Sequence, residues 1–488
     1  MSDTLGYALL PSIVISSTAL IVMLFAAIKR EHRYTSLLTS LGLFVALSIQ
    51  LSQIKNAPFQ SDLFLFDGTT SLLSALLILV ALLLSFLLYP WLENLKDPKE
   101  EYYMLFLLAT QGALVVCASS HFASFFLGLE LMGLSLVPMV AYPDRDNKAL
   151  EAGIKYLVLS AVASAFVLMA IAIIYFYSGT LDIQEIAQHL PFANNETQVN
   201  DVIYGAAIIL LLVGFAFKLS LAPCHLWLAD LLEGSPLPTA ALLATLSKAA
   251  IFVVLIRLFS YGNWHQQEAI IVIISAVAVA SMLIGNFLAL LQNNLLRLLA
   301  FSSVAHFGYI LLAILAIQPA DSIAGETTLA NEAAIYYLFA YLLTSAGAFS
   351  ILMILQHDTP SLPFTLERLR GLFWLKPATA LVLTLLFLSL AGIPLTIGFV
   401  GKFYLTLAAV NGQLWGMLAA LVIGSVVGIY YYLRVVLMMA EKPKQQTTRY
   451  HKPHSISDLI IMGLVTLMVM GIGIFPAKLA TIIEQLVA

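Results

Sequence analysis

The segment FFLGLELMGLSLV, residues 125–137, has the composition of a membrane-spanning helix, yet it contains the carboxylate of Glu130 at its centre. All its other residues are apolar or small. A charged side chain at the centre of a bilayer costs about 2.5–3.5 kcal/mol even on the most lenient scale. Such residues usually face a protein interior or a wet cavity, so the segment predicts a transmembrane helix with a functional carboxylate.

The composition extends this interpretation to the whole chain. Of 488 residues, 61% are hydrophobic and 10% are charged, whereas a soluble chain is roughly a quarter charged. Apolar runs long enough to cross about 30 Å of hydrocarbon recur from end to end. We predict an all-α polytopic membrane protein without a soluble domain, whose N-terminal apolar run is a retained first span.

About fourteen membrane-spanning helices are predicted from these runs. They lie near residues 7–28, 34–54, 68–92, 102–119, 121–142, 152–178, 201–222, 236–261, 267–291, 294–317, 331–356, 377–394, 412–440 and 457–475. Pro223–Glu233 and Leu395–Val410 are predicted to be second halves of interrupted helices, because proline removes a backbone donor.

The distribution of Lys and Arg supports this number of spans. Loops after odd-numbered spans contain 14 of these residues, and loops on the other side contain only Lys55 and Lys478. Because Lys and Arg favour the cytoplasmic side, both termini are expected on the non-cytoplasmic side.

Two pairs of similar strings indicate an internal repeat. YLVLSA (156–161) resembles YLLTSA (341–346), and LSLAP (219–223) resembles LSLAGIP (388–394). Each pair member lies in a block of five spans with a proline-interrupted helix, so the second block enters the membrane from the opposite side. Paired interrupted helices are typical of inverted-repeat transporters; chance similarity between Leu/Ala/Ser-rich helices is the alternative.

Seven basic residues lie inside or at the ends of the predicted spans. Lys155 and Arg297 are near span ends, where long side chains can reach the interface, and the roles of Arg257 and Arg434 stay open. Lys218, Lys248 and Lys402 lie deeper, two of them beside Pro223 and Pro394. Buried lysines beside helix interruptions mark candidate ion or proton pathways.

Lys218 is the expected counter-ion of Glu130, because the two lie in the same block. Neutralising one member of a buried pair changes the proton affinity of the other, which is what a proton pump requires. The alternative is a structural ion pair. His225 and His306 lie between the lysines along the chain, and histidine is a suitable proton relay, although a packing role is the alternative for each.

At this point the motifs are recognisable as those of a known family. The chain resembles the antiporter-like membrane subunits of respiratory complex I, the proton-pumping NADH:quinone oxidoreductase. The similar segments extend over nearly the whole length and lie at residues 89–109, 121–142, 150–166, 214–227, 296–313 and 388–405.

The resemblance implies fourteen helices with two inverted five-helix repeats and a polar axis across the bilayer midplane. By position, Glu130, Lys218, Lys248 and Lys402 match the charged residues of that axis, and His225 and His306 fall on associated polar positions.

The implied division is an N-terminal three-helix segment (1–100), a first repeat (101–262), a second, inverted repeat (263–440) and a C-terminal helix (441–488). The implied function is proton translocation in a bacterial inner membrane, among other membrane-arm subunits and lipids. No nucleic acid and no small-molecule substrate beyond protons is expected.

No CxxC motif, P-loop or GxGxxG fingerprint is present, so no means of holding a cofactor is visible. FMN, iron–sulfur clusters and quinone are expected on other subunits, and no metal site on this one.

One departure from the family pattern concerns PCHLWLADLLEGSP, residues 223–236, where Cys224, Leu228 and Ala229 replace the common residues and Asp230 is kept. Two other functions stay open: a subunit of a multi-subunit Na⁺/H⁺ antiporter, and a scaffold whose charges only fix helix packing.

Overall fold

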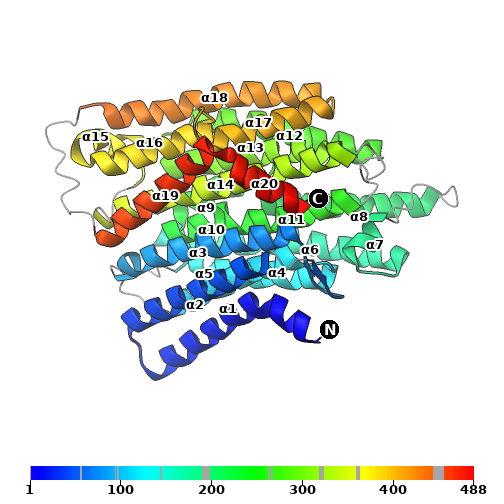
Figure 1. Cartoon of the computed structure of the whole chain (residues 1–488), viewed down its shortest axis with the longest axis horizontal. Helices are drawn as coiled ribbons and strands as arrows, with labels where there is room; N and C mark the ends of the chain where they lie inside the picture. The colour runs from blue at the N-terminus through cyan, green and yellow to red at the C-terminus, as the bar shows by residue number, and fades with distance from the viewer. Residues whose placement is uncertain are drawn as a thin grey trace.

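The computed structural model describes residues 2–54, 58–93, 95, 98–142, 146–188, 198–261, 264, 267–317, 324–358, 363–442 and 455–487. Figure 1 shows long helices that run in roughly one direction across the view, with α1 and α2 at one end of the molecule and α18 at the other. The prediction of an all-α polytopic protein is confirmed.

The helices of the N-terminal half are α1 (Ser2–Ile28), α2 (His32–Gln53), α3 (Gly68–Glu93), α4 (Glu100–Ala118), α5 (Phe122–Val140), α6 (Asn147–Ser178), α7 (Ile183–Gln188), α8 (Gln198–Leu219), α9 (Leu226–Gly234), α10 (Leu237–Ala244) and α11 (Leu246–Tyr261). A short antiparallel hairpin, which the sequence did not predict, joins α2 to α3. Its strands are β1 (Phe59–Gln60) and β2 (Leu65–Phe66).

The helices of the C-terminal half are α12 (Glu268–Leu290), α13 (Leu295–Leu315), α14 (Ala324–Asp358), α15 (Leu372–Leu375), α16 (Pro377–Ala391), α17 (Ile397–Asn411), α18 (Trp415–Ala440), α19 (Ile456–Ile474) and α20 (Pro476–Val487), with a 3₁₀ turn η4 (Leu366–Leu369). Helices α19 and α20, red in Figure 1, pack against α14.

Thirteen helices in the described part of the chain are long and apolar enough to cross a membrane, with α10 and α11 taken together as one. The predicted twelfth span and the second half that follows it correspond to the shorter helices α16 and α17. Helices α3, α10, α11, α13 and α14 are almost fully buried and form the centre, whereas α1, α18 and α19 expose most of their surface. The exposed helices therefore present apolar side chains on the outside of the bundle.

The first predicted helix interruption is confirmed at Pro223. Helix α8 ends at Leu219, four residues before this proline, and α9 begins at Leu226. The Ala222 backbone N–H between them donates to Ser281 Oγ on α12, at 2.9 Å. A side chain of a neighbouring helix thus satisfies a backbone group that the break releases.

The second predicted interruption is confirmed near Pro394. Helix α16 ends at Ala391 and is followed by Gly392, whose positive φ of 82° glycine adopts without the steric cost of a side chain. The Ile393 N–H then bonds back to the Leu388 carbonyl at 3.0 Å. Helix α17 restarts at Ile397 and carries Lys402 in its second turn.

A third interruption was not predicted and corrects the expected continuous span at 236–261. Thr245 has φ −119° and ψ −82°, so it leaves helical geometry between α10 and α11. The Ala244 carbonyl beside it accepts a hydrogen bond from the Tyr341 hydroxyl at 3.0 Å. No proline or glycine marks this break, which lies three residues before Lys248.

Candidate functional site: buried lysines and histidines at helix interruptions

Lys218 lies in the last turn of α8, and its side chain is buried. The ammonium donates a hydrogen bond to Ser160 Oγ on α6, at 2.8 Å. A Cβ placed on Gly133 of α5 would lie 3.9 Å from Nζ, so α5 also passes beside this ammonium. Three helices therefore meet at Lys218, directly before the first interruption.

Glu130 is half-buried on α5, one helical turn before Gly133. Within the described residues no ion pair joins its carboxylate to Lys218, whose ammonium points to Ser160 instead. The two charges still interact through space. The expected pair is thus close enough for electrostatic coupling but is not a direct contact.

His225 follows Pro223 and immediately precedes α9, and its side chain is 5% exposed. Neither ring nitrogen has a hydrogen bond of normal geometry with any residue that the structure describes, although the Pro223 carbonyl interacts with the ring. The ring lies edge-on to Phe301, with centroids 6.1 Å apart. The charge of Lys248 also acts on the ring.

Lys248 is 1% exposed and lies in the first turns of α11, just after the unpredicted break. Its ammonium donates to Ser303 Oγ on α13 at 2.7 Å and lies 5.1 Å from the centre of the Phe307 ring. The Tyr341 hydroxyl oxygen lies 2.9 Å from the same Ser303 oxygen, within hydrogen-bond distance. A tyrosine of α14 thus joins the lysine's hydrogen-bond network.

His306 is fully enclosed on α13 and has a phenol at each ring nitrogen. Nδ1 lies 2.7 Å from the Tyr337 hydroxyl and Nε2 lies 3.3 Å from the Tyr432 hydroxyl. The charges of Lys248 and Lys402 both act on the ring. Both lysines are therefore near enough for their charges to affect His306.

Lys402 lies on α17, just after the second interruption, and is 9% exposed. Its ammonium donates to the Ala391 carbonyl, the last residue of α16, at 2.8 Å. It also lies 5.4 Å from the centre of the Tyr309 ring. The ammonium therefore binds a backbone carbonyl that the helix break leaves free.

The structure thus places a buried lysine at each of the three helix interruptions, and none of the three forms an ion pair with a described residue. Sequence reasoning missed the tyrosines around them. Tyr337 and Tyr341 lie four residues apart on one face of α14, and Tyr341 stands in a repeat string. This helical spacing of hydroxyls was the signal that could have indicated them.

Two basic residues whose roles the sequence left open donate hydrogen bonds to backbone carbonyls. Arg257 is 4% exposed and donates to the carbonyls of Leu65, at 2.9 Å, and Ser119. It therefore binds α11 to the hairpin and to the end of α4. Arg434 donates to the Leu290 carbonyl at 3.2 Å, where α12 ends.

The divergent segment after Pro223 takes part in a network of ion pairs near its end. Arg297 of α13 pairs with Asp230 at 2.6 Å and Glu233 at 3.0 Å, both on α9. Lys155 of α6 pairs with Glu151 at 2.6 Å and approaches Asp230 at 3.6 Å. The short helix α9 is therefore joined to α6 and α13, and Lys155 and Arg297 do reach the edge of the bundle.

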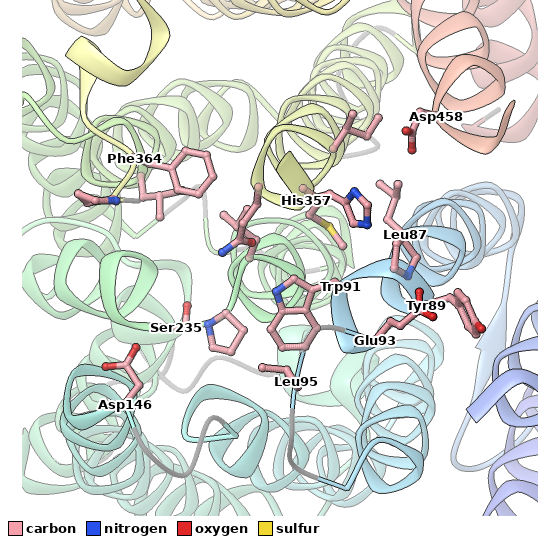
Figure 2. Close-up of a pocket in the computed structure, with 18 of the residues that line it drawn as sticks. Leu87, Tyr89, Trp91, Glu93, Leu95, Asp146, Ser235, His357, Phe364 and Asp458 are labelled. Carbon is pink, nitrogen blue, oxygen red and sulfur yellow. The ribbon is translucent and has the colours of Figure 1, made fainter. Parts of the chain in front are cut away.

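A cavity of about 940 Å³ lies at one end of the bundle (Figure 2). Its walls are formed by residues at the ends of α3, α9 and α14 and at the start of α19, among them Glu93, Ser235, His357 and Asp458. Figure 2 shows Trp91 between Ser235 and Glu93. Residues at the start of α10 also line the cavity, and α10 leads to Lys248.

No group of three or more His, Cys, Asp or Glu side chains in the described ranges is arranged to hold a metal ion. Together, the long apolar helices, their interruptions and the buried ammonium groups define a multi-pass membrane protein with charged groups in its interior. Comparison with known proteins identifies its family.

The family model described as NADH:quinone oxidoreductase/Mrp antiporter, TM matches residues 119–428. A protein from Shewanella woodyi named NADH-quinone oxidoreductase subunit N is 46% identical over 98% of this chain and 99% of its own length. The chain therefore belongs to the NADH:quinone oxidoreductase/Mrp antiporter family of membrane subunits.

Solved structures show the same fold. A chain of respiratory complex I from Thermus thermophilus superposes with a TM-score of 0.80 at 28% identity, covering 96% of this chain and 98% of that one. A chain of the Mrp complex from Dietzia sp. has a TM-score of 0.83 at 19% identity over 99% and 97% of the two chains. The second likeness concerns the fold alone.

Proposed function

We propose that this chain is a proton-translocating membrane subunit of an NADH:quinone oxidoreductase. The 46% identity to a protein of that name over almost the full length supports the assignment. The observation that carries the mechanism is the set of three buried ammonium groups, each at a helix interruption and each without an ion-pair partner among the described residues. A buried ammonium of this kind is costly to keep charged, so it can pass its proton on.

The proposed pathway follows the order of the buried groups. Glu130 modulates Lys218 through space, because its charge acts on the ammonium without binding it. Lys218 exchanges its proton through His225 with Lys248, and His306 connects Lys248 to Lys402, the exit-side group. Moving one charge against 100 mV requires about 2.3 kcal/mol, so these transfers must be coupled tightly to electron transfer in other subunits.

The cavity in Figure 2 is the proposed site of proton uptake. Its walls come from helix ends on the face where the Lys- and Arg-rich loops gather, which the charge rule places in the cytoplasm. Helix α10 begins at the cavity and has eight residues, so about 12 Å separate the cavity from the break before Lys248. Protons from the cytoplasm would enter here and leave on the side of both termini.

Several assignments go with this function. The membrane is the bacterial inner membrane, the partners are other membrane-arm subunits and lipids, and FMN, iron–sulfur clusters and quinone belong to other subunits. The two inverted repeats at 101–262 and 263–440 are supported by interrupted helices in both blocks, α8–α9 and α16–α17. The segments 1–100 and 441–488 flank them.

A native gel of a mild detergent extract tests the assignment. A blot for this chain should co-migrate with a large band that reduces dye with NADH. Migration in a smaller band without NADH activity would favour the multi-subunit Na⁺/H⁺ antiporter, and Na⁺-dependent proton flux would then be measured.

A further inference from the structure

We propose that Tyr432, His306 and Tyr337 form a three-residue proton switch between Lys248 and Lys402, an inference that rests on the proton-translocating function above. The three side chains come from α18, α13 and α14, so the switch exists only where these helices meet. The two tyrosines would then be proton-carrying residues, which neither the sequence motifs nor the family match indicates.

The geometry around His306 carries this proposal. Its Nδ1 lies 2.7 Å from the Tyr337 hydroxyl and its Nε2 lies 3.3 Å from the Tyr432 hydroxyl. A neutral imidazole has one N–H donor and one acceptor nitrogen. One phenol must therefore donate to the ring while the other accepts from it. The hydrogen bonds through the three side chains, which form a row, thus all point in one direction.

Each phenol contacts a residue close in the chain to a different lysine or to that lysine's hydrogen-bond partner. Tyr337 packs against Gly401, the neighbour of Lys402, because a Cβ on that glycine would lie 2.8 Å from the tyrosine ring. The Tyr432 hydroxyl interacts with Ser302. The adjacent residue Ser303 accepts the 2.7 Å hydrogen bond from Lys248. The row therefore extends from the serines beside Lys248 to the glycine beside Lys402.

One passage conserves every proton. It begins with the ring proton on Nδ1. The Tyr432 O–H bond breaks as an Nε2–H bond forms, and the Nδ1–H bond breaks as an O–H bond forms on Tyr337. The original Tyr337 proton leaves to the neutral amine of Lys402, while Tyr432 takes up the proton that the ammonium of Lys248 releases. No group is oxidised or reduced.

The switch also sets a limit on each turnover. After one passage the ring carries its proton on the other nitrogen and must return to the first tautomer before it accepts again. Each cycle of the switch therefore passes a single proton, and a phenylalanine at either end stops it by removing one hydroxyl.

Tyr336 provides a matched control because it is the neighbour of Tyr337 on α14. Its side chain is 1% exposed, it stacks on Tyr404, and its hydroxyl has no hydrogen-bond partner among the described residues. Tyr336→Phe removes the same atom from the same helix at the same depth. Any effect that comes only from losing a buried hydroxyl should appear in this variant as well.

The experiment measures the initial rate of NADH-driven acidification of inverted membrane vesicles that contain the assembled complex. Positioned acid–base groups contribute about 10²–10⁴-fold to a rate, so Tyr337→Phe and Tyr432→Phe should each lower it at least tenfold. Tyr336→Phe should match the natural protein, and NADH-dependent dye reduction should be normal in all three.

Three further variants distinguish failure of the switch from failure of the proposed function. If both phenylalanine variants pump like Tyr336→Phe while Lys402→Met does not pump, the switch is wrong and the proposed function stands. Normal pumping by Lys402→Met would overturn the proposed function itself. If the phenylalanine variants fail to assemble, 3-fluorotyrosine at position 337 keeps the hydroxyl but changes its acidity. A pumping rate equal to that with 3-fluorotyrosine at 336 would then overturn the switch.

Discussion

At the scale of single residues, the deep lysines and their partners could be predicted only in part. Lys218, Lys248 and Lys402 were recognisable because apolar spans rarely contain charge. Their hydrogen-bond partners were not, because Ser160, Ser303 and the Ala391 carbonyl are ordinary groups that only helix packing places beside the ammonium groups. The same packing points Lys218 to Ser160, so Glu130 and Lys218 form no ion pair in the described part of the chain.

Replacing Glu130 tests the through-space coupling to Lys218. Glu130→Gln removes the charge and keeps the shape, so proton pumping per NADH should fall several-fold, but assembly should be normal. Glu151→Gln is the control, because that carboxylate is 64% exposed and pairs with Lys155 at the edge of the bundle. Acidification of inverted vesicles measures both variants, and equal rates would argue against any role for Glu130.

Gly392 should tolerate no side chain. Its φ of 82° disfavours alanine by about 1 kcal/mol or more. An added Cβ would also lie 2.7 Å from Cδ of Lys402. Gly392→Ala should therefore lower both the thermal stability of the complex and its pumping. Gly416→Ala, where a Cβ meets nothing within 4 Å, should leave both unchanged; a similar loss there would show that the effect is not local.

At the scale of elements, the interruptions at Pro223 and Pro394 were predictable because proline cannot continue the backbone hydrogen bonds of a helix. The break at Thr245 was not, because a β-branched residue in an apolar run is compatible with a continuous helix. What stabilises that break lies outside the segment, in the Tyr341 hydroxyl that binds the Ala244 carbonyl. Tertiary contacts of this kind leave no local signal in the sequence.

The role of Arg257 in joining elements can be separated from proton transfer. Arg257→Ala would leave the carbonyls of Leu65 and Ser119 without their donor in a buried site. Each unsatisfied group costs about 1–3 kcal/mol, so the melting temperature of the complex should fall. Pumping per NADH in the fraction that still assembles should be normal. A stable complex with impaired pumping would instead place Arg257 on the proton pathway.

At the scale of the whole molecule, hydropathy and the Lys/Arg distribution indicated a polytopic protein with about fourteen crossings. The structure has thirteen long apolar helices in its described part and the pair α16–α17. The loop residues Lys55, Lys96, Arg145, Lys444, Arg449 and Lys452, on which the topology partly rests, lie outside the described residues. The division of the chain into two inverted repeats stays a prediction.

The central claim is that the buried lysines carry protons, and Lys248 is the most direct place to test it. Lys248→Met keeps the apolar stem and removes the ammonium, and Lys442→Met, on the exposed side of α18's end, is the control. The measurement is proton uptake per NADH oxidised by inverted vesicles, after a native gel has verified assembly. We expect Lys248→Met to lose the proton uptake that this subunit drives and Lys442→Met to retain it. Equal proton uptake in the two variants would contradict the claim that the buried lysines carry protons.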